Sequence, residues 1–439
     1  MRIRIAAVAV ALCVQSAASW AQMGLLDIYQ QALVHDADFA AARAARRAGA
    51  EAAPQGLSWL LPSVNFSASK MRNDYQNGIN RPRDYDYSTE TRRVQLVQPL
   101  FNLERYARYR QGQARFDYSE AQFINANQEF TLKVAEQYFN YLLAQDSLVL
   151  VRAQKQAIGE QKKQAEQMFK GGVGTITDIQ EAQARYDLVV ADELAAVNTL
   201  EVKQRELKKL IGEIPKALRS LSEQLPLESP KPIDMEFWID AARQANPRVK
   251  QQKANTEYAQ HDVTRARSDF FPSVDLVLSR QRVNEPNYYT DREITRSSGI
   301  QLNIPLFEGG RTLSATREAL ANRDKAQQEL ESVQRDAELK ASQAYLDVMN
   351  GIAKIRALEQ AVKSSETSLK GTKIGLDVGL RTSVDVLNAQ QQFFQARRDL
   401  LKARYSYVLA RLSLLAAAGT LGEDAILEVD RWLNRSAIA

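Results

Sequence analysis

The sequence contains the same unit twice. Four short motifs of the first half return in the second half in the same order, at offsets of 206 to 210 residues. A near-constant offset over ordered motifs indicates tandem duplication of one unit of about two hundred residues. The paired motifs are residues 58–64 and 268–274, 99–101 and 305–307, 138–140 and 345–347, and 172–182 and 379–389. Each unit combines two short strand-like runs with very long helices and cannot bury its own surfaces, so we expect the function to depend on how copies assemble.

Residues 1–21 are predicted to be a signal peptide. Arg2 and Arg4 precede an apolar core at 5–14, and small residues stand before the expected cleavage after Ala21. This core is too short to span a membrane as a helix. Cys13, the only cysteine, falls within it, so the exported chain is expected to have no thiol, disulfide or Cys-based metal site. The net charge of +5 is too small to indicate nucleic-acid binding.

The distribution of proline predicts the helices. No proline lies between Pro99 and Pro215, and none follows Pro305. Both intervals are rich in good helix formers. We expect helices over 103–170 and 177–210 with a break at 171–174, and in the second copy a break around 371–379 followed by a helix to about residue 418. At 1.5 Å per residue the long helix extends roughly 100 Å, more than an ordinary globular domain needs.

The strands are expected where the prolines cluster. Residues 62–70 place Val64, Phe66 and Ala68 on one face, and residues 93–98, 273–279 and 300–304 alternate similarly. Runs of about 9–11 residues suit a tilted strand that crosses a bilayer. Residues 73–89 and 284–296 are predicted to be polar, Tyr-rich loops. Each unit is expected to open with one helix, at 25–58 and 235–268, which gives a first repeat at 22–228 and a second at 229–439.

Four strands cannot close a barrel by themselves. A sheet edge exposed to lipid leaves backbone groups unpaired in hydrocarbon, which costs several kcal/mol for each group. If these strands cross a membrane, several chains must therefore share one barrel. Two chains would give eight strands and three would give twelve, and the larger barrels can hold an aqueous channel.

The order helix, strand, strand, long helix, glycine break, helix, twice over, resembles the TolC-type outer-membrane efflux channels. The likeness covers essentially the whole exported chain. Its motifs include Leu61-Pro62, Gln98-Pro99-Leu100-Phe101, Gly172 to Ala182, Pro305-Leu306-Phe307-Glu308-Gly309-Gly310, Val378 to Leu387, and Ala403-Arg404-Tyr405.

The resemblance implies an α+β membrane fold: a long antiparallel α-helical barrel continuous with a β-barrel that closes only in a homotrimer. A mixed equatorial region would use the segment after Pro215 and the C-terminal residues 421–433. The implied function is the exit duct of a tripartite efflux pump or a type I secretion system in the Gram-negative outer membrane. Implied partners are outer-membrane lipid, a periplasmic adaptor, and an ABC-type or RND-type inner-membrane transporter, with no cofactor and no enzymatic activity.

The same resemblance assigns residues at the helix tips. Gln167, Asp178 and Arg381 correspond to polar links that close the periplasmic end. Asp385 and Asn388 correspond to two acidic positions at the constriction, so a trimer would carry one ring of aspartates, and Leu376 stands where the family has a linking tyrosine. The tips that dock the adaptor would be Gly172, Val173, Gly174, Val378, Gly379 and Leu380.

Other interpretations remain open. Thr175 with Asp178, and Thr382 with Asp385, also fit capping boxes, where a carboxylate at a helix N-terminus contributes roughly 0.3–1 kcal/mol. Capping and gating can coexist. A periplasmic coiled-coil adaptor would also have long helical hairpins, although it would not need paired strands of bilayer length. His35 and His261 lack metal-ligand spacing, so no metal site is expected.

Overall fold

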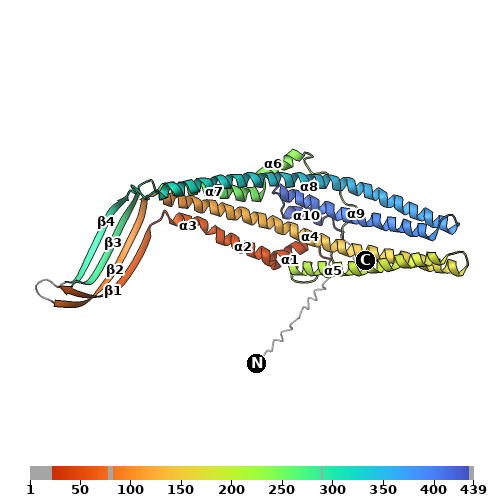
Figure 1. Cartoon of the computed structure of the whole chain (residues 1–439), viewed down its shortest axis with the longest axis horizontal. Coiled ribbons are helices and arrows are strands. Elements are labelled where there is room, and N and C mark those ends of the chain that lie inside the picture. The colour runs from red at the N-terminus through yellow and green to blue at the C-terminus, as the bar shows by residue number, and fades with distance from the viewer. Residues whose placement is uncertain (1–21, 78–82, 288–289, 435–439) are drawn as a thin grey trace, which may run out of the picture.

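The computed structural model describes residues 22–77, 83–287 and 290–434, so the predicted signal peptide lies outside the described residues. Figure 1 shows an elongated chain in which a four-stranded sheet bends away from one end of a long helical part, while two helical hairpins end at the other. The elements are α1 (Leu25–His35), α2 (Ala37–Ala50), α3 (Ala52–Ser58), β1 (Ser63–Asn77), β2 (Arg83–Phe101), α4 (Leu103–Lys170), α5 (Ile176–Ile211), α6 (Met235–Ala245), α7 (Pro247–Ser268), β3 (Ser273–Asn287), β4 (Thr290–Asn303), α8 (Arg311–Asp377), α9 (Ser383–Ala417) and α10 (Glu423–Asp430). The same order of strands and long helices therefore occurs twice. The predicted boundary at 228/229 falls between α5 and α6 and stays a prediction.

The two longest helices, α4 and α8, contain 68 and 67 residues. α4 has the predicted bounds, and Asn102 caps it by accepting a hydrogen bond from the Arg105 N–H. The predicted break near Gly371 is wrong, because α8 continues to Asp377. Its last turns pack on α9, where Leu369 and Leu376 are buried with Val386 and Ala389. This packing keeps the segment helical although each interior glycine costs about 1 kcal/mol relative to alanine.

The opening helix of each unit is broken, which corrects the prediction of one continuous helix. In the first unit Asp36 ends α1 and caps α2, accepting a 2.7 Å hydrogen bond from the Phe39 N–H. A further break at Glu51 separates α2 from α3. In the second unit Asn246 caps α7, and Pro247 occupies its first turn, where the missing N–H costs nothing.

The sheet has the order β1-β2-β3-β4, and every neighbouring pair is antiparallel. Most of the residues predicted as loops at 73–89 and 284–296 belong to strands, so that prediction is wrong. The apolar alternation stops there, but cross-strand polar pairs continue the ladder. Arg72 pairs with Asp86, and the Asn73 side-chain amide donates to Thr89 Oγ1 at 2.6 Å.

The main hydrophobic core lies halfway along the helices. We call this region the waist: the centres of α4 and α8, the C-terminal half of α9 and the C-terminal end of α5, with α1, α6, α10 and residues 212–234. The Tyr138 hydroxyl donates to the Arg219 carbonyl at 2.8 Å, and the Tyr407 hydroxyl donates to the Glu228 carbonyl at 3.0 Å. Bridges at Met23↔Leu218 and Leu221↔Leu433 join the segment after α5 to both ends of the described chain. The segments expected to form an equatorial region therefore lie together.

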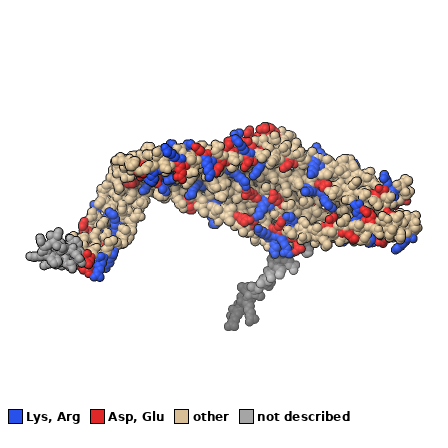
Figure 2. All heavy atoms as spheres, viewed as in Figure 1, with Lys and Arg blue, Asp and Glu red and all other residues tan. Residues whose placement is uncertain are grey.

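Charged side chains are spread along the helical part. Figure 2 shows lysines and arginines interspersed with acidic residues, without a large patch of one sign on the face in view. Within the described ranges, no helix combines the length and the apolar character needed to cross a membrane.

Candidate functional site at the helical tips

The second helix of each hairpin, α5 in the first and α9 in the second, begins with a capping box. The Thr175 N–H donates to Asp178 Oδ2 at 3.1 Å, and the Asp178 N–H returns a bond to Thr175 Oγ1 at 3.3 Å. Thr382 and Asp385 repeat this arrangement with distances of 2.9 and 3.2 Å. The capping predicted from the sequence is confirmed at both tips.

The Asp385 carboxylate is held in its charged form. The backbone N–H and the hydroxyl of Thr382, followed by the nearby Arg381 guanidinium, hold the pKa of this side chain below its ordinary value. Donors that favour the anion lower a carboxyl pKa in this way. A residue at the start of α9 therefore carries a negative charge at neutral pH, as a ring of charge at a constriction would require.

The two turns between the helices are short and apolar at their outer surface. Gly172 and Gly379 have φ values of 78° and 76°, a backbone conformation that residues other than glycine rarely adopt. Val173 and Leu380 are 79 % and 81 % exposed, and Val378 is also exposed. Gly174 completes the first turn. All six residues predicted to dock an adaptor thus lie at the extreme end of the helices.

The predicted tip-closing residues do not bond to one another in a single chain. Within the described part of the chain, no hydrogen bond or ion pair joins the side chains of Gln167, Asp178 and Arg381. Asp178 bonds to Thr175, and Gln167 is exposed. The Arg381 side chain packs over Gly375, where an added Cβ would lie 2.7 Å from Arg381 Cγ. Their role as links stays a prediction about the assembled channel.

A different arginine joins the two hairpins. Arg185 on α5 donates from Nη2 to Asn388 Oδ1 on α9 at 3.1 Å, and from Nη1 to Gln391 on the same helix. Its Nε bonds to Glu181 at 2.9 Å, one turn back on α5. Arg185 was not predicted from the sequence. The Glu181–Arg185 spacing of four residues was visible, but it is an ordinary helical ion pair and gave no sign of the contacts across to α9.

A second contact between the hairpins is buried. The Gln161 side-chain amide on α4 donates to Ser383 Oγ, at the first turn of α9, over 3.2 Å. Both residues are buried, and the bond satisfies one of the polar groups that Gln161 would otherwise leave unpaired. Polar contacts from α4 and from α5 therefore join the first hairpin to the same helix, α9.

The sheet is open, with two free edges, and it continues into helices about 100 Å long whose hairpins are joined by polar contacts near their tips. This arrangement defines one sector of a tubular duct. The comparisons with known proteins agree. The model of the family described as "Outer membrane efflux protein" matches residues 28–213 and 238–420. The chain belongs to this family.

The relatives match along nearly their full lengths. The alkaline protease secretion protein AprF of Pseudomonas aeruginosa is 35% identical over 91% of this chain and 85% of its own. The proteases secretion protein PrtF of Dickeya chrysanthemi is 31% identical over 95% and 92%. Among solved structures, the outer membrane protein VceC of Vibrio cholerae superposes with a TM-score of 0.78 at 18% identity, over 90% of this chain and 96% of that one.

The predicted fold class and function are confirmed by these findings. The chain is an outer-membrane exit channel for efflux or type I secretion, and its long helical part extends into the periplasm. The alternative of a periplasmic adaptor is set aside. Channels of this family form trimers and work with periplasmic adaptors and inner-membrane transporters.

Proposed function

We propose that the helical tips of three copies form the periplasmic gate of this duct. The observation that carries the proposal is the bond from Arg185 to Asn388, which ties α5 to α9 within a turn of Asp385. Asp385 supplies one ring of three carboxylates, and Asn388 is occupied by the arginine contact. Gln167, Asp178 and Arg381 would complete the closure between neighbouring chains. No enzymatic role is proposed for any of these residues.

The exposed turns are the surface that we assign to the periplasmic adaptor. Val173, Val378 and Leu380 project at the far end of the hairpins. Covering an exposed aliphatic side chain is favourable by roughly 1.5–3 kcal/mol. Docking at these turns would also act directly on the ends of α5 and α9, which hold the gate.

The cargo that we propose is protein, delivered by an ABC-type transporter through type I secretion. The support is that AprF and PrtF, which are aligned over most of this chain, carry names that describe protease secretion. The second candidate is small-molecule efflux with an RND-type transporter, which the description of the family favours. Deleting the gene and comparing the culture medium for secreted protein with the sensitivity of the cells to toxic compounds separates the two. Loss of resistance with unchanged secretion would overturn the protein assignment.

The gate is tested by current recordings from the purified channel in planar bilayers. We expect Asp385→Ala to weaken block by multivalent cations, because the ring loses its charge. Thr382→Ala is the matched control, since it removes the hydroxyl of the cap at the start of α9 and keeps the Asp385 carboxylate. Equal loss of block in both variants would show that the cap, and not the ring, is responsible. Arg381→Ser is expected to raise conductance, and an unaltered value would remove Arg381 from the closure.

A further inference from the structure

The corresponding strands of the two repeats, β2 and β4, differ in length, with 19 and 14 residues. β2 runs to Phe101, and its last residues pair only with β3. β4 ends at Asn303, although residues 304–307 repeat the motif that ends β2. These four residues have no strand partner in one chain, and Leu306 and Phe307 are 92% and 87% exposed. A segment built like a strand and left unpaired indicates a missing neighbour.

The repeat predicts that neighbour residue by residue, because strand register follows the repeat within the chain. Moving β1 forward by 210 residues and β2 forward by 206 turns the pair Ser63↔Val97 into Ser273↔Asn303. It turns Phe66↔Val94 into Leu276↔Ile300, and Asp74↔Asp86 into Asn284↔Arg292. Every β1–β2 pair between these limits becomes an observed β3–β4 pair. Adding 210 to β1 positions and 206 to β2 positions therefore reproduces the register of β3 and β4 over this whole length.

We propose that β4 of one copy pairs with β1 of the next copy in the register obtained by applying the same offsets to β2 and β3. The observed pairs Leu96↔Leu278, Gln98↔Leu276 and Phe101↔Val274 are the templates. They place Leu302 opposite Ala68 of the next copy, Ile304 opposite Phe66, and Phe307 opposite Val64. The irregularity between Pro99 and Phe101 returns between Pro305 and Phe307. This inference rests on the trimer of the proposed function.

The side chains support this register independently of the offsets. Ile304 and Phe66 are both apolar and exposed, and so are Leu302 and its neighbours on that face. On the other face Asn303 meets Ser67 and Gln301 meets Ser69, so polar residues oppose polar residues. A slip of one residue would set each apolar side chain opposite a polar one.

Charge supports the same pairing farther along the strands. The template pair Glu90↔Asn284, in which the asparagine amide donates to Glu90 Oε2 at 3.1 Å, becomes Arg296 opposite Asp74 of the next copy. Both of these residues are exposed in one chain. Opposite charges on directly opposed strand residues contribute roughly 0.2–1 kcal/mol. A slip of two residues would keep the faces but lose this pair.

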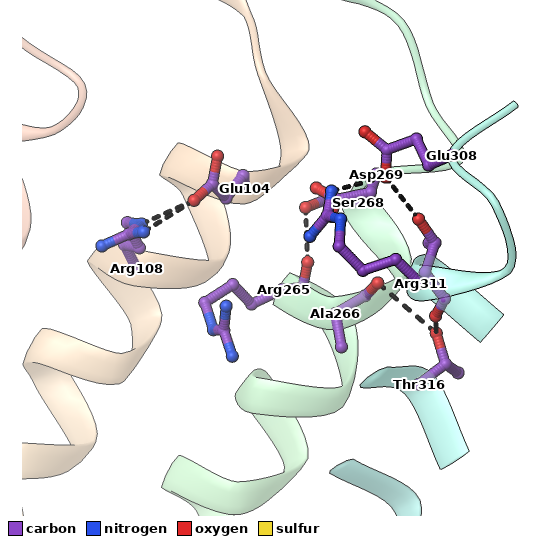
Figure 3. Close-up of polar contacts among 10 residues, drawn as sticks. Glu104, Arg108, Arg265, Ala266, Ser268, Asp269, Glu308, Arg311 and Thr316 are labelled. Carbon is purple, nitrogen blue, oxygen red and sulfur yellow. Dashed lines mark hydrogen bonds and ion pairs between the residues drawn. The ribbon is translucent and has the colours of Figure 1, made fainter. Parts of the chain in front are cut away.

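The unpaired segment is anchored at both ends. Asn303 is paired with Ser273 of β3. After Phe307, Glu308 accepts a bond from Thr312 Oγ1 at 2.7 Å and an ion pair from Arg311, whose Nη2 also lies 3.2 Å from Asp269 Oδ2 at the end of α7. Figure 3 shows Arg311 between Asp269 and Glu308. Residues 304–307 are thus held close to the position that a strand would need.

Cysteine pairs test the register, and Cys13 is the only native cysteine. Residues directly opposed across strands have Cβ atoms about 4.5–5.5 Å apart, whereas diagonal neighbours lie at roughly 7–8 Å, and a disulfide needs about 3.5–4.5 Å. Chains with Leu302→Cys plus Ala68→Cys are oxidised in outer membranes and run on non-reducing gels. We expect covalent dimers and trimers, several-fold more than from Leu302→Cys with Phe66→Cys or with Lys70→Cys, which report slips of two residues. Each single-cysteine chain gives the background.

The outcomes separate the register from the trimer. Stronger cross-linking with Phe66→Cys or Lys70→Cys would overturn the register while leaving the trimer intact, and so would trimers that conduct but show no cross-link. Monomers in every sample, with no conductance, would overturn the shared barrel and the proposed function together. If the Leu302→Cys chains do not assemble, Ile304→Cys with Phe66→Cys reports the same register.

Discussion

The sheet and the waist bury their residues to very different degrees. Val64, Phe66, Ile300 and Leu302 of the sheet are exposed in one chain, whereas Tyr138, Tyr407 and Ile426 of the waist are almost fully covered. The waist is therefore completed by residues of its own chain. The sheet acquires its cover only from lipid and from the edge strands of two other copies. The comparison indicates that the helical part of a chain can fold before the barrel exists.

Truncation of Tyr138 is expected to give the largest loss of stability in the waist. Its ring is buried and packs against Phe139 with ring centres 5.3 Å apart. We expect Tyr138→Ala to lower the free energy of unfolding by about 3–5 kcal/mol because it leaves a cavity. Thermal unfolding of the helical circular-dichroism signal measures this loss. Tyr138→Phe, which gives up only the bond to Arg219, should cost about 1 kcal/mol. Equal stability in all three chains would mean that the waist is not the stabilising region.

Charging the free edge should break assembly while leaving the waist folded. Leu302→Arg places a cation on the apolar face of the sheet, which would contact lipid in the assembled barrel, at a cost of about 1–3 kcal/mol for each chain. We expect fewer trimers in detergent extracts, with the helical signal unchanged. Asn303→Arg is the matched control, since its side chain lies on the opposite face. If both variants reduced trimers equally, the two faces would not differ in environment.

Removing Arg185 should loosen the gate without changing the stability of the waist or the assembly of the sheet into trimers. The two bonds to α9 are partly exposed, so we expect Arg185→Ala to raise the open fraction in bilayer recordings roughly two- to tenfold, as for a loss of about 0.5–1.5 kcal/mol. Arg205→Ala is the control, because among the residues that the structure describes Arg205 pairs only with Glu201, on its own helix. Unchanged gating in Arg185→Ala would leave the closure to Gln161 and to contacts between copies.

The smallest expected effect concerns a carboxyl group in the waist. Burial raises the pKa of Asp146 above its ordinary value, although the Tyr405 hydroxyl, which donates to it at 2.6 Å, acts against this. A raised folded-state pKa means that stability is lost as the pH rises through it. Asp146→Asn should therefore raise the melting temperature slightly near pH 8 and have little effect near pH 4. A gain confined to acid pH would contradict this sign.

The sequence was a reliable guide where one local rule acts alone. The ends of α4 follow from Asn102 and from Gly171 and Gly172, and the two capping boxes lie where Thr and Asp are spaced by three. The fold class followed from the resemblance to the efflux channels, which the motifs of the two repeats carried. Local rules failed where contacts between elements decide the outcome. α8 passes through Gly371 because α9 covers Leu376, and the outer halves of the strands persist because polar residues meet across them.

The candidate site was predicted in part. Asp178 and Asp385 could be found because each stands three residues after a threonine at a helix start. The partners of Asn388 could not, because Arg185 lies 203 residues away in the sequence and meets it only when the hairpins pack. The roles of Gln167 and Arg381 concern neighbouring copies, so they remain predictions that one chain cannot display.

The two free edges of the sheet belong to the same polypeptide, which has a genetic consequence. A chain with a damaged β4 still offers an intact β1, so it can join two normal copies and leave the ring unclosed. If half of the chains in a cell carried such a defect and mixed at random, roughly one trimer in eight would contain only normal chains. Edge-strand variants of this channel should therefore be dominant over the normal copy, whereas variants that prevent the waist from folding should be recessive.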